Sequence, residues 1–271
     1  MNREMVFGQY YPASSPIHKL DPRTKLFSAL VFIVAVFLCD SFYSYIACYA
    51  FLTIVIILSR VPLLSILKTI KAVIFIIIFT AIINVFFYKE GKILVSWWVI
   101  KITDEGLIYA SKIVLRIVFL VISTSMVTFT STPMALTDGM ESLMKPLKVL
   151  RFPVHDVAVI MSTALRFIPT LMEEVDKIIM AQKARGAHFD NGGLIKRAKA
   201  LLPILIPLIV STFRRADELA LALDARCYNA TPNRTKMKPL KFKWADLIAT
   251  ICLAVFLTII ILLKLGFFGL I

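Results

Sequence analysis

Two apolar stretches separated by a single charge constrain this chain more than any other feature of its sequence. Within residues 26–58 the only charged residue is Asp40, which is followed by Ser41. A helix needs roughly 20 apolar residues to cross a bilayer, so this stretch can cross twice, with Asp40 closing one helix and Ser41 capping the next. Hydrophobic residues make up 59% of the chain and charged residues 18%. We therefore expect an integral membrane protein and exclude a secreted or cytosolic enzyme.

Three more apolar stretches are long enough to cross a membrane. They cover residues 72–88, 107–130 and 244–263. Lysine and arginine concentrate on the cytoplasmic side of membrane proteins. Arg60, Lys68 and Lys71 follow the second crossing, whereas residues 89–105 balance three basic against three acidic residues. We expect about five transmembrane helices, with the amino terminus in the cytoplasm and both residues 89–105 and the carboxyl terminus outside.

The start of the first helix can be located from the sequence. The first 25 residues are polar and rich in turn residues, and they lack the apolar core of a cleaved signal peptide. Asp21 can accept hydrogen bonds from the free amides at a helix start, and Pro22 is favoured at the first helical position. Arg23 and Lys25 in the first turn oppose the helix dipole. That is tolerable where positive charge holds this end of the helix inside the cell.

Two features near the outer side have alternative interpretations. Lys112 and Arg116 are four residues apart on one face of the fourth span. Cations inside a membrane are candidate functional residues, but both side chains are also long enough to reach the interface. Residues 93–100, with Trp97 and Trp98, are too short to cross the membrane and are typical of an aromatic patch at its surface.

Residues 131–243 do not resemble a membrane-spanning region. They hold 18 basic and 10 acidic residues, and apolar residues recur at helical spacing in two long amphipathic patterns. Residues 200–213 are apolar and contain Pro203 and Pro207, but a crossing there would place a basic segment outside. We therefore predict a cytoplasmic insert of two amphipathic helices, the second lying along the inner membrane face with kinks at its prolines.

The two amphipathic helices end in the same way, 41 residues apart. Each closes with alanine, arginine and a small residue: Ala184, Arg185 and Gly186 in the first, and Ala225, Arg226 and Cys227 in the second. A helix cap is one interpretation, because Gly186 tolerates a positive φ and arginine favours the negative end of a helix dipole. The other is a pair of equivalent guanidinium groups offered to a partner with two equivalent sockets, most simply a dimer.

Small residues also mark the second helix of this pair. Ala216 and Ala220, four residues apart, remove bulk from one part of the helix. Helices whose backbones cross closely need such small residues. Ordinary helix propensity explains alanine equally well, so both interpretations stay open.

The sequence offers no catalytic or metal-binding pattern. It has no phosphate-binding G-x-x-x-x-G-K loop, no G-x-S-x-G turn and no H-E-x-x-H pair. His18, His155 and His188 are scattered, and we interpret them as structural or solvent-facing. Cys39, Cys48, Cys227 and Cys252 lack metal-ligand spacing and are interpreted as small buried residues. We expect no metal, no cofactor and no nucleic-acid partner.

The amino-terminal sequence resembles a known family. The stretch that contains Leu20, Asp21, Pro22, Arg23 and Lys25 is similar to the amino-terminal signature of the T component (EcfT) of energy-coupling factor transporters and of related cobalt and nickel permeases. The paired Ala-Arg motifs resemble the coupling-helix motifs of that family. The likeness covers nearly the whole chain. Cys227 departs from it, since glycine is commoner there, which puts the geometry of the second cap in doubt.

The resemblance implies a non-catalytic subunit of an ATP-driven importer in the cell membrane. Such a subunit links two cytoplasmic ATP-binding-cassette ATPases, which dock on the arginine motifs, to a membrane S component that captures a vitamin or metal ion. The expected fold is all-α, with four spans in residues 1–130, a cytoplasmic coupling module in 131–243 and a last span in 244–271. The main alternatives are an ion-gradient-driven secondary transporter, which predicts inverted repeats and midplane charges, and a membrane-embedded enzyme.

Overall fold

The computed structural model describes residues 10–87, 92–97, 100–150, 153–187, 194–228 and 240–265. The chain divides into two compact units. Unit 1 comprises Met1–Val154 together with Leu240–Ile271, and unit 2 comprises His155–Pro239. The domain boundaries expected at residues 131 and 243 concern membrane topology and stay a prediction.

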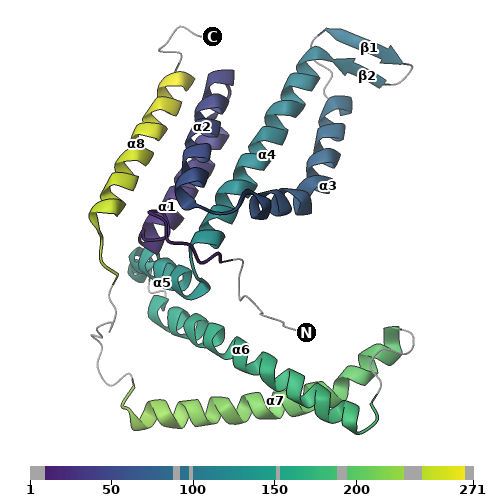
Figure 1. The fold of residues 1–271 in the computed structure, drawn as a ribbon, viewed down its shortest axis with the longest axis vertical. Coiled ribbons are helices and arrows are strands. Elements are labelled where there is room, and N and C mark those ends of the chain that lie inside the picture. The colour runs from purple at the N-terminus through teal and green to yellow at the C-terminus, as the bar shows by residue number, and fades with distance from the viewer. Residues whose placement is uncertain are drawn as a thin grey trace. The chain divides into compact units, whose positions relative to one another are not determined.

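Unit 1 is a helical bundle with one small hairpin. Its helices are α1 (Pro22–Leu38), α2 (Phe42–Ser59), α3 (Leu63–Phe87), α4 (Asp104–Thr130), α5 (Pro133–Leu143), the 3₁₀ helix η1 (Lys145–Leu150) and α8 (Trp244–Lys264). Helices α1 and α2 both pack against α4 and α8, while α3 packs against α4 (Figure 1). The strands β1 (Ile93–Trp97) and β2 (Ile100–Thr103) pair in antiparallel fashion between α3 and α4. This hairpin was not predicted, because a short apolar segment near the interface carried no turn signal.

Capping side chains explain where several helices begin. The Asp21 carboxylate accepts a 2.9 Å hydrogen bond from the Arg23 amide, and Pro22 is the first residue of α1, as predicted. Thr103 caps α4 through the Gly106 amide at 3.2 Å. The turn between α1 and α2 is also where it was expected, but Ser41 occupies the cap position of α2 without a side-chain hydrogen bond. The polar turn, rather than a strong cap, separates these two helices.

The core of unit 1 joins helices α1, α2, α4 and α8. Phe32 of α1, Phe51 of α2 and Phe256 of α8 stack, with ring centroids 4.3 Å apart for Phe51 and Phe256 and 5.7 Å apart for the other two pairs. Cys39 and Cys48 are buried in the same core, as predicted. The prediction of burial is wrong for Cys227 and Cys252, which are exposed, because Cys227 follows the end of α7 and Cys252 lies on an exposed face of α8.

Unit 2 consists of two long helices. They are α6 (Val154–Ala184), which begins at the last residue of unit 1, and α7 (Leu194–Ala225). The helices run without interruption through Pro169 in α6 and through Pro203 and Pro207 in α7. Figure 1 shows that they cross each other. The predicted pair of long amphipathic helices is therefore present.

Five helices in the described part of the chain are long and apolar enough to cross a membrane: α2, α3, α4, α6 and α8. The mean hydropathy of an 18-residue window is 1.2 in α6, against 2.0 to 2.8 in the other four helices. Helix α1 spans 17 residues, which is at the short end of the range for a helix that crosses a bilayer. The predicted fold class, an all-α polytopic membrane protein, is confirmed, with the β1–β2 hairpin as a local addition.

Candidate functional site

The two arginine motifs form the same structure at the ends of α6 and α7. In α6 the Gly186 amide donates to the Lys183 carbonyl at 3.0 Å and the Ala187 amide to the Gln182 carbonyl at 3.0 Å. In α7 the Cys227 amide donates to Asp224 and the Tyr228 amide to Leu223, both at 2.9 Å. This pair of bonds defines a Schellman cap, in which the residue after the helix takes a left-handed conformation.

The left-handed positions are Gly186, with φ of 86°, and Cys227, with φ of 51°. Cys227 thus adopts the geometry for which glycine is the usual residue. The doubt that its side chain raised about the second cap is removed by the matching bonds. Arg185 and Arg226 precede these two positions, so the sequence repeat is also a repeat of backbone structure.

The guanidinium groups take no part in these caps, which are made by backbone atoms. Arg185 and Arg226 are both exposed. Among the described residues, neither side chain has a hydrogen-bond or ion-pair partner. Capping therefore explains the residues that follow the arginines, but it does not explain why arginine itself stands at both positions.

One carboxylate joins the two helices of unit 2. Glu174 of α6 accepts a hydrogen bond from the Ser211 hydroxyl and forms a 2.8 Å ion pair with Arg215, both on α7. The Gln182 amide adds a 3.3 Å bond to the Pro203 carbonyl. Sequence analysis missed Glu174 and Arg215, since their charges alone do not distinguish them from the solvated residues around them.

The alanines predicted to mark a helix crossing lie next to this contact along the chain. Ala216 follows Arg215 directly, and Ala220 lies one turn further along α7. Both are exposed in unit 2. Their role in a close crossing stays a prediction.

The amino-terminal signature is built into unit 1 by buried charges. The Asp246 carboxylate is fully buried, and it accepts a 2.7 Å bond from the Asp21 amide and a 2.9 Å bond from the Lys243 amide. Lys25, only 5% exposed, donates to the Thr130 carbonyl at 2.8 Å and to the Ser131 hydroxyl at 3.2 Å. The signature therefore connects α1 to the end of α4 and to the start of α8.

The segment before α1 is folded against the same place. His18 Nε2 lies 2.9 Å from the Tyr11 carbonyl, and His18 Nδ1 lies 2.7 Å from the Ser15 hydroxyl. A carbonyl only accepts, so Nε2 carries the proton and the Ser15 hydroxyl donates to Nδ1. Burial, and to a smaller extent the Lys25 ammonium, lower the pKa of His18 below its ordinary value of 6.5. The prediction of a structural histidine fits a ring that has a hydrogen bond at each of its two nitrogens.

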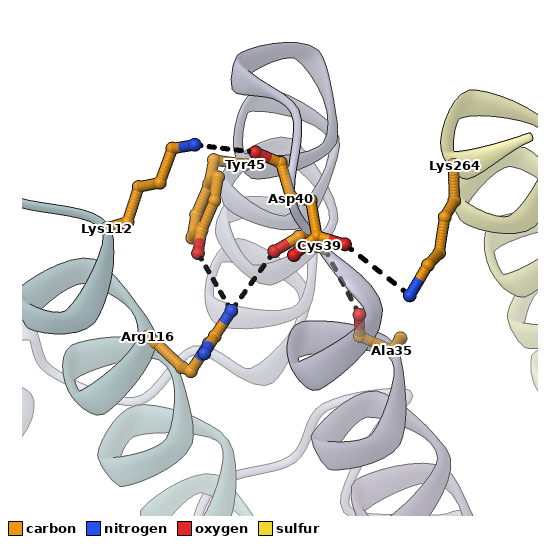
Figure 2. Close-up of polar contacts among 7 residues, drawn as sticks. All are labelled: Ala35, Cys39, Asp40, Tyr45, Lys112, Arg116 and Lys264. Atoms are coloured by element: carbon orange, nitrogen blue, oxygen red, sulfur yellow. Dashed lines mark hydrogen bonds and ion pairs between the residues drawn. The ribbon is translucent and has the colours of Figure 1, made fainter. Parts of the chain in front are cut away.

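Lys112 and Arg116 fasten the turn between α1 and α2 (Figure 2). Lys112 Nζ donates to the Asp40 carbonyl at 2.9 Å, and Arg116 donates to the Cys39 carbonyl at 3.2 Å and to the Tyr45 hydroxyl at 3.3 Å. Lys264 of α8 reaches the Asp40 carboxylate at 3.5 Å. These contacts favour the structural interpretation of the two cations over a role in transport.

The described part of the chain holds no group of three or more histidine, cysteine, aspartate or glutamate residues that could bind a metal ion. Its fold and charged sites define a class, that of polytopic membrane proteins that carry a pair of long helices with matched, exposed arginines. Residues 13–237 match the CbiQ family, described as cobalt transport protein. The chain belongs to this family and, within it, to the T components (EcfT) of energy-coupling factor transporters, as the sequence resemblance predicted.

Curated relatives match over nearly their full length. The energy-coupling factor transporter transmembrane protein EcfT of Ruminiclostridium cellulolyticum is 46% identical over 99% of this chain and 100% of its own. The protein of the same name from Clostridium kluyveri is 46% identical over 97% of both chains. That from Bacillus subtilis is 42% identical over 97% of this chain and 100% of its own.

Proposed function

We propose that this protein is the membrane scaffold of an energy-coupling factor importer. It links two cytoplasmic ATP-binding-cassette ATPases to a membrane S component that captures a vitamin or a metal ion. The observation that carries the proposal is the repeated cap, which presents Arg185 and Arg226 at equivalent ends of α6 and α7 with exposed side chains. The relatives named as energy-coupling factor transporter proteins support the same assignment.

Each arginine is suited to bind one ATPase subunit. A guanidinium offers several donors in a planar fork and binds carboxylate or carbonyl groups through charge-assisted bonds, whereas lysine offers a single point charge. Two equivalent arginines require two equivalent sockets, and a dimer of ATPases provides them. When the ATP-bound dimer closes, it displaces the ends of α6 and α7, and the apolar faces of these helices pass the motion to the S component.

This role requires the arginines to lie in the cytoplasm. We propose that α1, α2, α3, α4 and α8 cross the membrane and that residues 131–243 lie inside with the amino terminus. The low mean hydropathy of α6 and its charged residues Glu173, Glu174 and Lys177 argue against a sixth crossing. The positive charge of residues 131–243 argues for the inner side. A residue near Asn191 should therefore react with an impermeant thiol reagent only in opened cells, once native cysteines are replaced.

The scaffold itself is not an enzyme in this proposal. Its sequence contains no phosphate-binding loop, so ATP hydrolysis belongs to the partner subunits. The purified single chain should therefore hydrolyse no ATP above a matched empty preparation, and it should move no solute in liposomes. Transport by the solitary chain would instead support an ion-driven carrier.

The test of ATPase docking is a pull-down from membranes with arginine variants. Truncating one member of a buried charge pair costs about 2 to 5 kcal/mol, which weakens that contact by roughly 30-fold or more. Because one ATPase dimer holds both contacts, Arg185→Ala or Arg226→Ala should each leave a partly assembled complex, and the double variant should lose the ATPases. Arg185→Lys should bind more weakly than the wild type.

The matched control replaces two other exposed cations of the same helices. Lys183 of α6 and Arg214 of α7 have exposed side chains, and neither occupies the arginine position or the left-handed position of a cap. The double variant Lys183→Ala/Arg214→Ala removes the same charge, and it should retain the ATPases. Full retention of the ATPases by a folded Arg185→Ala/Arg226→Ala protein would refute the docking role.

A further inference from the structure

The first turn of α1 lies at the base of both chain segments that lead to unit 2. The outgoing segment follows Thr130, the last residue of α4, and passes through α5 and η1 to α6. The returning segment enters α8 at Trp244. Three charged residues at the start of α1 and α8, Asp21, Lys25 and Asp246, lie between these points, and we name them the α1 anchor.

On the returning side, Asp246 joins two helix starts. One oxygen of its carboxylate accepts the Asp21 amide at 2.7 Å, and the other accepts the Lys243 amide at 2.9 Å. Lys243 is the cap residue of α8, and Asp21 is the cap residue of α1. A single buried carboxylate therefore fixes the beginning of α8 to the beginning of α1.

On the outgoing side, Lys25 holds the end of α4. Its ammonium bonds the Thr130 carbonyl and the Ser131 hydroxyl, and it also donates to the His18 carbonyl at 3.2 Å. Asp246 and Asp21 provide negative charge close to this buried ammonium. The residues that begin the path to α6 are thus tied to the same turn of α1.

Helix α5 is seated on that turn by close packing. A Cβ atom added at Gly139 would lie 3.1 Å from Pro22 Cβ, 3.2 Å from Leu26 Cδ1 and 3.3 Å from the Pro22 carbonyl carbon. These separations are shorter than ordinary van der Waals contact, so a side chain at this position would require Pro22 or Leu26 to move by a few tenths of an ångström. Four segments, α1, α4, α5 and α8, therefore meet at one rigid place.

We propose that the α1 anchor and the close contact of α5 with α1 at Gly139 hold in a fixed position the chain segments that lead to α6 and return from α7. We call this fixed arrangement the mount. Asp246 and Gly139 are then positioning residues for transport. The inference rests on the proposed function. A displacement imposed on α6 by the ATPases does work on the S component only if the base of α6 does not yield. A loosened mount absorbs the motion, and ATP is then hydrolysed without uptake.

Two variants loosen the mount in chemically different ways. Asp246→Asn keeps the size of the side chain and removes its charge, which weakens the bond to the Asp21 amide and leaves Lys25 with one fewer counter-charge. Gly139→Ala inserts a methyl group between α5 and Pro22 and changes no charge. Alanine also has a higher helix propensity than glycine, which offsets part of the strain and favours a folded protein.

The measurement is substrate uptake per ATP hydrolysed, with the complete complex of scaffold, ATPases and S component in liposomes. In both variants we expect the ATPases to co-purify as with the wild type and to hydrolyse ATP at a similar rate. Uptake per ATP should fall by about 10-fold, which is typical of the loss of a coupling of 1 to 3 kcal/mol. The matched control Asp40→Asn, an exposed carboxylate at the other end of α1, should couple as the wild type does.

The outcomes separate this inference from the proposed function. Unchanged uptake per ATP in both assembled variants would overturn the mount and leave the docking role of Arg185 and Arg226 in place. Absence of ATPases from the wild-type complex would overturn the proposed function itself. If Asp246→Asn does not fold, Gly139→Ala alone decides, because its change is steric and leaves the buried charged residues unaltered.

Discussion

The charged contacts of the two units differ in burial and in number. The three charged residues of the α1 anchor are at most 7% exposed. The Asp246 carboxylate and the Lys25 ammonium each make at least two hydrogen bonds. The contact between α6 and α7 depends on Glu174 and Arg215, whose side chains are 19% and 37% exposed. Buried and multiple contacts fix one geometry, whereas a half-exposed pair of charges is weak and adjustable. The difference suits a rigid base and a movable pair of helices.

The strongest test of this difference removes the buried ammonium. Lys25→Met keeps the apolar stem but removes the hydrogen bonds to the Thr130 carbonyl and the Ser131 hydroxyl and the positive charge near the buried Asp246, which should lower the free energy of unfolding by about 3 to 5 kcal/mol. Thermal unfolding in detergent measures the loss. Lys19→Met, at an exposed position six residues earlier, should unfold like the wild type. Equal stability of the two variants would show that the anchor is no more constrained than the surface.

The turn at Cys39 and Asp40 provides an intermediate case within unit 1. Arg116 makes two hydrogen bonds there and lies 5.7 Å from the Phe37 ring centroid, while Lys112 makes one exposed bond to a carbonyl. We expect Arg116→Met to cost about 2 kcal/mol and Lys112→Met less than about 1 kcal/mol. Thermal unfolding of both variants checks the order. The reverse order would indicate that burial does not set the strength of these contacts.

Substitutions at the two left-handed cap positions of unit 2 should change the stability of the helix ends in opposite directions. A left-handed conformation costs a non-glycine residue about 1 to 2 kcal/mol, so Gly186→Ala should destabilise the end of α6. Cys227→Gly removes the same cost from α7 but adds freedom to the unfolded chain, which leaves a gain of about 0.5 to 1 kcal/mol. Hydrogen exchange of the Ala187 and Tyr228 amides reports each cap directly. Changes of the same sign would argue against equivalent caps.

Local features were predictable from the sequence, and long-range pairings were not. The cap at Asp21 and Pro22 and the left-handed Gly186 depend on neighbouring residues, so their residue types identify them. Asp246 contacts the Asp21 amide across 225 positions, and no local pattern distinguishes it from another acidic residue at a helix start. The shared face of Lys112 and Arg116 was visible, but their acceptors are largely backbone carbonyls, which every residue carries.

The smallest expected effect on stability concerns the movable pair itself. Glu174→Gln removes a half-exposed ion pair worth about 0.2 to 1 kcal/mol, so thermal unfolding should change little. The angle between α6 and α7 should change more, because Ser211 and Arg215 both bind this carboxylate. Spin labels at positions 161 and 221, in a protein without native cysteines, should show a broader distance distribution in this variant.

The matched control for that measurement is Glu173→Gln, which changes an exposed carboxylate at the preceding position of α6. It should leave the distance distribution unchanged, because Ser211 and Arg215 bind Glu174. If Glu174→Gln also left the distribution unchanged, backbone packing would hold the two helices and the contrast with the α1 anchor would fail. A broader distribution with unchanged ATPase binding would show that the Glu174 carboxylate sets the angle between α6 and α7. It would also show that docking through Arg185 and Arg226 does not depend on that angle.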